Sequence, residues 1–142
     1  MPIKKSAGVC VLSEGKSILL AKRPKYWGEK KIPVPFAEHW SIFCGAMEGN
    51  ETPAECAVRE LHEESKIEIS TKELDYAGEL RNFKKNILHV YFCNLNYLPN
   101  VSLNAEHTSY MWWDIRQIED FPYKIEKNLF NKIKKYLEKI ED

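Results

Sequence analysis

The sequence lacks any long apolar run, and this absence argues against a protein that spans a membrane with a helix. The first thirty residues hold no stretch near the roughly 18–20 apolar residues that a membrane-spanning helix needs, and no charged start precedes an apolar signal core. An excess of one charge is also missing, because 21 Lys and Arg balance 21 Asp and Glu. A neutral chain has no global preference for polyanions or lipid surfaces, so any anion site must be local. We therefore expect a cytoplasmic protein that binds neither nucleic acid nor membranes.

Paired cysteines are missing as well. The sequence has no Cys-x-x-Cys pair and no histidine at zinc-finger spacing, and its four cysteines lie far apart: Cys10, Cys44, Cys56 and Cys93. Buried free thiols are favoured over two disulfides, because nothing else in the sequence argues for secretion. With 142 residues and no internal repeat, we expect one domain, residues 1–142, built around a single core.

Short apolar segments separated by turns make up most of the chain. Runs at 7–12 and 17–21 flank a glycine-containing turn and predict a hairpin. Further strands are predicted at 40–44, 74–80, 87–95 and 110–113, with a turn at 82–86. A C-terminal amphipathic helix is predicted from apolar residues every three or four positions: Ile125, Leu129, Ile133, Leu137 and Ile140. Strands interrupted by one central and one terminal helix favour an α/β fold, a mixed sheet flanked by helices.

The segment 24–38 is long for a connection in a compact domain and shows no sustained periodicity. It holds three prolines, three lysines and the aromatic residues Tyr26, Trp27 and Phe36. Two interpretations remain open: a segment that grips a ligand, and a plain surface loop.

The sequence predicts a central helix from the residues at its N-terminus. Thr52 is a good N-cap, Pro53 suits the first helical position, and Glu55 completes a capping box. On a helical projection an apolar stripe forms from Ala54, Ala57, Val58 and Leu61. We expect this stripe to pack on the sheet, with carboxylates at its edge.

Those carboxylates are Glu60, Glu63 and Glu64, crowded into five positions. Glu60 and Glu64 are four residues apart and repel by roughly 0.2–0.5 kcal/mol when both are ionised. A hard divalent cation turns this repulsion into coordination. Arg59 can orient the carboxylates and offset their charge, and Glu51 precedes the cap and can reach the same site.

The stretch from Gly45 to Ile67 resembles the signature of the Nudix hydrolases, the family that includes MutT-like proteins. Its charged positions match at the family spacing: Gly45, Glu51, Arg59, Glu60, Glu63 and Glu64. Lys66 replaces the usual glycine, and Cys44 stands where a glycine is frequent before Gly45. A lysine at this helix end would need positive φ, at a cost of roughly 1 kcal/mol. The resemblance implies an α/β/α sandwich with a catalytic loop-helix-loop, and hydrolysis of a nucleoside diphosphate linked to another moiety.

Physical chemistry suggests roles for these residues. Mg²⁺, with Mn²⁺ as a substitute, would be held chiefly by Glu60 and Glu64, assisted by Glu63 and by the carbonyl of Gly45. The general base is left open between Glu60 and a loop residue, Glu106, that resembles the acidic loop position of many family members. For the substrate, we expect contacts from Arg23, Lys22 and Glu51, although Arg23 and Lys22 could equally be ordinary strand-end charges.

Three functional hypotheses remain. The first is a metal-dependent pyrophosphohydrolase that releases a nucleoside monophosphate, the second is a silent Nudix-like module that senses nucleotides, and the third is an acidic interaction helix on a structural domain. The identity of the small-molecule nucleotide is not encoded in the motif. Sheet edges and aromatic content leave both monomer and homodimer open.

Overall fold

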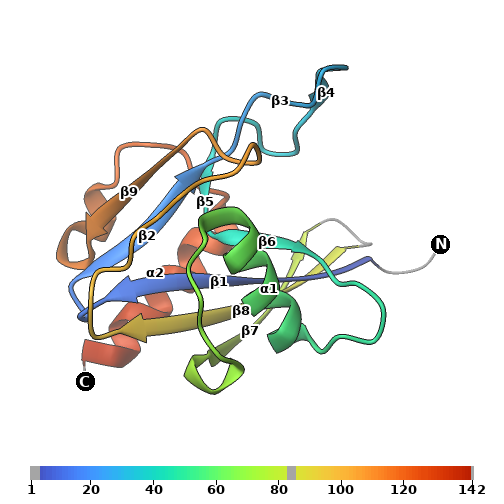
Figure 1. Ribbon diagram of the computed structural model, residues 1–142. Coiled ribbons are helices and arrows are strands. Elements are labelled where there is room, and N and C mark those ends of the chain that lie inside the picture. The colour runs from blue at the N-terminus through green and yellow to red at the C-terminus, as the bar shows by residue number, and fades with distance from the viewer. Residues whose placement is uncertain (1–3, 83–85, 142) are drawn as a thin grey trace.

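The computed structural model describes residues 4–82 and 86–141. Within them, one mixed sheet of seven strands forms the centre of the molecule (Figure 1). Its strands are β1 (Lys4–Ser13), β2 (Ser17–Lys22), β5 (Trp40–Ser41), β6 (Phe43–Ala46), β7 (Asp75–Asn82), β8 (Asn86–Leu95) and β9 (Ser109–Asp114). The main path runs β5-β2-β1-β8-β7, while β6 pairs with β1 and β9 pairs with β2. β1 and β8 run parallel, whereas the other pairs are antiparallel.

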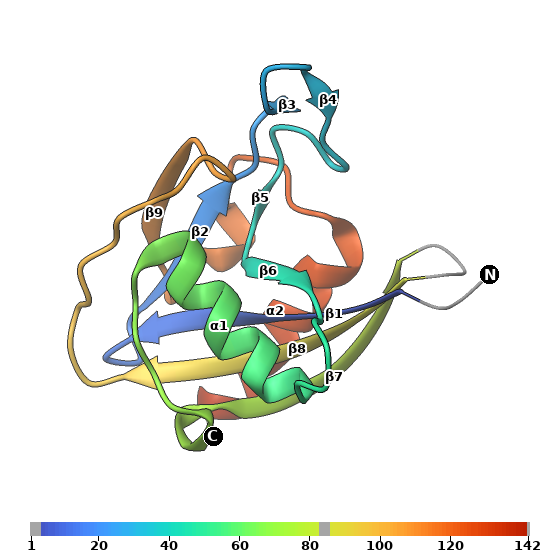
Figure 2. The ribbon, with the colours of Figure 1, turned by 45° about the vertical axis from the view of Figure 1, so that its right-hand side comes forward.

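Helices cover both faces of this sheet. Figure 2 shows α1 (Pro53–Ser65) in front of the sheet and α2 (Lys127–Glu141) behind it. Short 3₁₀ helices occupy η1 (Thr71–Glu73) and η2 (Ile115–Asp120). Two apolar layers result, one around Leu61 of α1 and Val9 of β1, the other around Ile133 of α2 and Phe92 of β8. The predicted α/β/α sandwich is therefore confirmed, because the sheet alternates apolar side chains onto two helix-covered faces.

The sequence predicts six strands and the described residues form nine, because 40–44 divides into two strands and 24–38 contains two more. The predicted strand 40–44 is split at Ile42, because β5 pairs with β2 and β6 pairs with β1. The ends of the predicted turn 82–86 belong to β7 and β8, and its residues 83–85 lie outside the described part of the chain. The hairpin of β1 and β2 is confirmed, with Leu12 opposite Ile18.

The C-terminal helix is shorter than its predicted stripe. Ile125 precedes α2 and forms an isolated bridge with Trp40, and Ile140 is 38% exposed. The buried stripe consists of Leu129, Ile133 and Leu137 alone. Including Ile125 was wrong, because its contact with Trp40 joins two segments that are distant in the sequence.

The predicted loop 24–38 contains two short antiparallel strands, β3 (Tyr26–Trp27) and β4 (Ile32–Pro33), and projects beyond the sheet (Figure 2). Its base is closed by two backbone hydrogen bonds, from Arg23 N to His39 O (2.9 Å) and from Glu38 N to Arg23 O (3.1 Å). The projection therefore starts and ends beside Arg23. No helix in the described ranges is both long and apolar enough to cross a bilayer.

Candidate active site

Helix α1 begins and ends as its sequence predicts. The Oγ1 of Thr52 accepts a hydrogen bond from the Glu55 N–H (3.2 Å), and the Glu55 carboxylate accepts one from the Thr52 N–H (2.8 Å). Lys66 ends the helix with φ 67° and donates its N–H to His62 O (2.9 Å). The capping box and the left-handed lysine are both confirmed, and together they fix where the glutamates of α1 lie along the helix.

The buried face of α1 is rotated relative to the predicted stripe. Cys56, Ala57 and Leu61 are fully buried, whereas Ala54 and Val58 are only partly buried. This rotation also buries carboxylates, since Glu60 is 7% exposed and Glu64 1%. The prediction that carboxylates lie at the edge of the apolar face was therefore wrong for these two residues.

Gly45 makes room for one of the buried carboxylates. A Cβ added at this position would lie closer than 3.0 Å to the Glu60 carboxylate carbon and to both of its oxygens. The carbonyl of Gly45 faces α1 and accepts a weak hydrogen bond from the Cys56 thiol (3.5 Å). The absence of a side chain in β6 thus allows a charged group to sit directly against the sheet.

Three carboxylates converge at this place. Oxygens of Glu60, Glu64 and Glu106 all lie within 4.8 Å of one another. Burial, followed by the adjacent Glu60 carboxylate, raises the pKa of Glu64 to about 11. Burial, followed by the charges of Glu60 and Glu63, also raises the pKa of Glu106. The loop residue Glu106, which is distant from α1 in the sequence, therefore belongs to the same cluster as Glu60 and Glu64.

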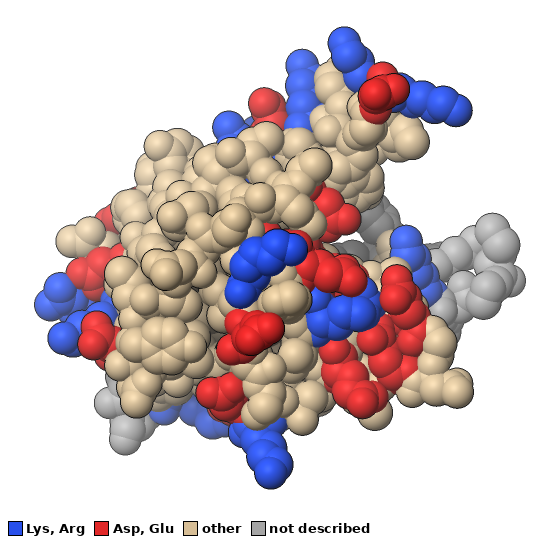
Figure 3. Space-filling model, viewed as in Figure 1, with Lys and Arg blue, Asp and Glu red and all other residues tan. Residues whose placement is uncertain are grey.

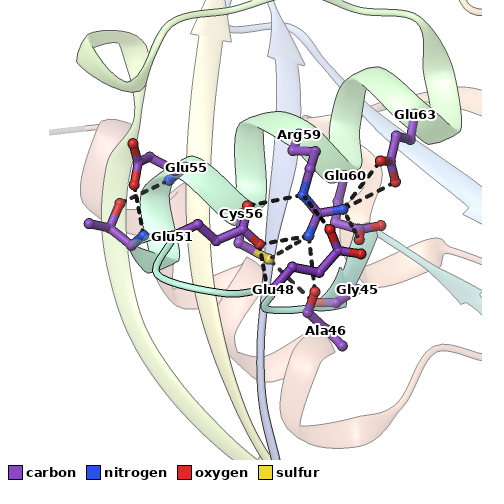
Figure 4. Close-up of polar contacts among 10 residues, drawn as sticks. Gly45, Ala46, Glu48, Glu51, Glu55, Cys56, Arg59, Glu60 and Glu63 are labelled. Carbon is purple, nitrogen blue, oxygen red and sulfur yellow. Dashed lines mark hydrogen bonds and ion pairs between the residues drawn. The ribbon is translucent and has the colours of Figure 1, made fainter.

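Arg59 links the remaining acidic side chains (Figure 4). Its Nε and one terminal nitrogen donate to the two oxygens of Glu51 at 3.0 and 2.7 Å, which holds the pKa of Glu51 down at about 2. The other terminal nitrogen contacts Glu60 at 2.8 Å and Glu63 at 3.2 Å. Glu63 is half exposed and lies outside the three-carboxylate cluster. A further bond to the carbonyl of Ala46 (3.0 Å) ties α1 to β6.

A cavity of about 380 Å³ opens above the carboxylates. Among its lining residues are Arg23, Trp27, Phe36, Gly45, Glu60, Glu64 and Glu106. The Nε of Arg23 donates to the carbonyl of Pro35 (2.9 Å), and its guanidinium lies 5.6 Å from the ring centre of Trp27. Figure 3 shows that acidic side chains gather over the start of α1 and the loop before it, with basic side chains among them. The projection 24–38 is thus part of the cavity wall.

Two of the predicted substrate contacts lie elsewhere. Lys22 lines a separate depression with Trp40 and Tyr123, whereas Arg23 lines the cavity of the carboxylates. Lys22 is the last residue of β2 and Arg23 directly follows it, and consecutive residues of an extended chain point to opposite sides. Glu51 does not line the cavity either, and both of its oxygens are engaged by Arg59. Its position supports a role in orienting Arg59.

His107 is a cavity residue that the sequence did not single out. It is 6% exposed, its ring meets Phe43 edge-on at 5.1 Å, and its Nδ1 lies 3.5 Å from Glu64 Oε1. Burial, helped by the charge of Arg23, lowers the pKa of His107 to about 4, so the ring is neutral at pH 7. Only its place after Glu106 could have marked it, since no periodic pattern includes it.

The family model of the NUDIX domain matches residues 2–135. The chain belongs to the Nudix hydrolase family. A curated relative, an octanoyltransferase from Myxococcus xanthus, is 26% identical over 117 residues, which are 78% of this chain. This Nudix chain spans about 30% of the length of that relative.

Solved structures share the fold of this Nudix chain. A MutT protein from Methanosarcina mazei Go1 superposes with a TM-score of 0.76 at 19% identity, covering 99% of this chain and 96% of the other. A bifunctional NMN adenylyltransferase/ADP ribose pyrophosphatase from Francisella tularensis, complexed with AMP and a Mn ion, has a TM-score of 0.74 at 19% identity. The match covers 97% of this chain and 42% of that protein.

Proposed function

We propose that this Nudix protein hydrolyses a diphosphate linkage in a nucleoside diphosphate joined to another moiety and releases a nucleoside monophosphate. One observation carries the proposal: Glu60, Glu64 and Glu106 place their oxygens within 4.8 Å of one another in a cavity of about 380 Å³. Three carboxylates so close together are costly unless a cation or shared protons offset their charge. The family supplies the class of reaction, and the cluster supplies the site.

The donor set fits Mg²⁺, with Mn²⁺ as a substitute. Carboxylate oxygens are the ligands that these hard cations prefer. Neither oxygen of Glu64 accepts a hydrogen bond from any N–H or O–H group of the described residues, although both are buried. Glu60 and Glu64 would hold the ion, and the Gly45 carbonyl stays a predicted ligand. A bound ion would neutralise the charge of the diphosphate and make water a stronger nucleophile.

Glu63 has a different part in this proposal. Its carboxylate is half exposed and paired with Arg59, which also contacts Glu60 and Glu51. Glu51 and Glu63 therefore hold the guanidinium from two sides, and the guanidinium holds Glu60 in place beside Gly45. We propose that Arg59, Glu51 and Glu63 keep the Glu60 carboxylate oriented. In this proposal Glu51 does not contact the substrate.

We propose Glu106 as the general base in preference to Glu60. One oxygen of Glu60 already accepts a hydrogen bond from Arg59 at 2.8 Å, so it is occupied in orienting that carboxylate. Glu106 is exposed enough to reach a water molecule, and its raised pKa suits proton transfer. We expect Glu106→Gln to lower kcat by about 10²–10⁴-fold, and to remove the acid limb of the pH profile of kcat/KM.

Arg23 and the projection 24–38 would bind the substrate. The Arg23 guanidinium shares the cavity with the carboxylates and suits a phosphate oxygen, while Trp27 and Phe36 provide aromatic surface for a nucleoside. A cavity of this size suits a small molecule of nucleotide dimensions. Which base and which leaving group it accepts depend on this projection.

The test is release of nucleoside monophosphate from a panel of nucleoside triphosphates and diphosphate-linked conjugates, with and without Mg²⁺ or Mn²⁺. We expect turnover that needs the metal and that Glu64→Gln abolishes. The matched control is Glu68→Gln, because Glu68 is an exposed glutamate whose partner is His62 on the outer face of α1. Undiminished turnover in Glu64→Gln would refute the assignment. Tight nucleotide binding without turnover at any metal concentration would support the sensor hypothesis instead.

Three broader predictions from the sequence belong to the same proposal. We propose that residues 1–142 are one folding domain, that the protein works in the cytoplasm, and that it is a monomer or a homodimer. A single cooperative unfolding transition, cell fractionation and light scattering test the three in turn.

A further inference from the structure

The loop that carries His107 is tied to both sides of the site. The side-chain amide of Asn104 donates to the carbonyl of Glu63 (3.1 Å) near the end of α1. The Thr108 N–H donates to the carbonyl of Lys22 (3.0 Å) at the end of β2. His107 lies between these two anchors, and its ring packs edge-on against Phe43 of β6. The position and tilt of the imidazole are therefore set by the fold.

Four buried polar atoms meet here without hydrogen-bond donors or acceptors that satisfy them. Both ring nitrogens of His107 and both carboxylate oxygens of Glu64 have no hydrogen-bond partner among the described residues. The Nδ1 of His107 lies 3.5 Å from Oε1 of Glu64, just beyond a good hydrogen bond. A histidine that served only to fill the core would have its nitrogens satisfied, because buried polar groups almost always are.

We infer that His107 is the positioning residue of Glu64: its Nδ1–H donates to Oε1 of the ionised carboxylate and leaves Oε2 free for a divalent cation. The inference rests on the proposed function, since it assigns a partner to one of the metal-binding carboxylates. A neutral imidazole has one N–H to give, and an ionised Glu64 carboxylate 3.5 Å from Nδ1, as in the metal-bound state, would select the tautomer with that proton on Nδ1. Partners of this kind hold a ligand in the orientation that the ion requires.

The test compares two substitutions of His107. His107→Asn keeps an N–H donor near the place of Nδ1, whereas His107→Leu replaces the ring by an apolar group of similar size. We expect isothermal titration with MnCl₂ alone to show binding about 10–100-fold weaker in His107→Leu and within about threefold of wild type in His107→Asn. His62→Leu, on the exposed outer face of α1, is the control and should bind as wild type does.

A second readout separates positioning from packing. Without metal, we expect His107→Leu to melt at or above the temperature of the wild type, because the imidazole nitrogens are unsatisfied in that state. Wild-type Mn²⁺ affinity in His107→Leu, equal weakening in His107→Asn, or a lower melting temperature of the metal-free His107→Leu would each overturn the inference while leaving the proposed function intact. A wild-type protein that bound no Mn²⁺ would overturn both.

Discussion

Replacing Gly45 by alanine adds one methyl group at the point where the sheet touches the carboxylate cluster. The backbone of Gly45 does not need positive φ, so alanine introduces no conformational strain there. The new Cβ would, however, lie closer than 3.0 Å to the carboxylate carbon and both oxygens of Glu60. Ordinary contacts of a Cβ begin near 3.4 Å, so the carboxylate has to retreat by roughly 1 Å.

This displacement is large for the proposed chemistry. Mg²⁺ requires near-ideal octahedral geometry with short bonds, and a misplacement of about 1 Å at a reacting group costs on the order of 100-fold in rate. The Arg59 hydrogen bond to Glu60 (2.8 Å) would also have to lengthen or rearrange. We therefore expect Gly45→Ala to lower kcat about 100-fold, which corresponds to roughly 2.7 kcal/mol in the activation barrier.

The assay is metal-dependent release of nucleoside monophosphate, together with titration of MnCl₂ and thermal unfolding. We expect Mn²⁺ affinity and kcat to fall in Gly45→Ala while the melting temperature changes little, because Glu60 is a side chain that can move. Gly8→Ala is the contrasting variant: its Cβ would meet the Cys44 side chain and, at 2.7 Å, the carbonyl of Phe43. That substitution should cost about 1–3 kcal/mol of stability. Full activity in Gly45→Ala would refute the reasoning.

Three further predictions concern the ends and charges of α1. Lys66→Gly should stabilise the protein by roughly 1 kcal/mol and raise the melting temperature by about 4 °C, because glycine takes the left-handed conformation of Lys66 (φ 67°) without strain. The pKa of Glu51 is lowered, so its ion pair with Arg59 stabilises the fold fully above pH 4.5, and this stabilisation is lost as the pH falls to about 2. Urea unfolding should show this loss of stability in the wild type and not in Glu51→Gln. Burial raises the pKa of Glu64 to about 11 without metal, so Mn²⁺ binding at pH 7 should release about one proton. Titration calorimetry in buffers of different ionisation enthalpy measures this release. No release would contradict the assigned protonation of Glu64.

Local interactions explain which parts of this fold were predictable. The capping box of Thr52 and Glu55, the left-handed Lys66 and the hairpin between β1 and β2 all join residues within a few positions of one another. The alternation of apolar residues likewise reports burial on a sheet face directly. Strand 40–44 failed at Ile42 because its two halves pair with different, distant strands.

The sequence by itself determined the helix that carries Glu60, Glu63 and Glu64, the residues that start and end it, and the family signature around them. These features depend on the spacing of residues along one helix, and that spacing can be read directly from the sequence. Only the tertiary structure decided which acidic side chains converge. It buried Glu60 and Glu64, brought Glu106 to them, left Glu63 at the surface, and directed Lys22 away from the cavity.

The same distinction applies to His107 and Gly45. The packing of a loop between α1 and β2 places His107 against Glu64. The close approach of β6 to α1 leaves room for the Glu60 carboxylate only because Gly45 has no Cβ. Both depend on how closely elements far apart in the sequence approach each other. Side-chain periodicity reports which face of an element is buried, whereas the distance between two packed elements is set by all the side chains between them.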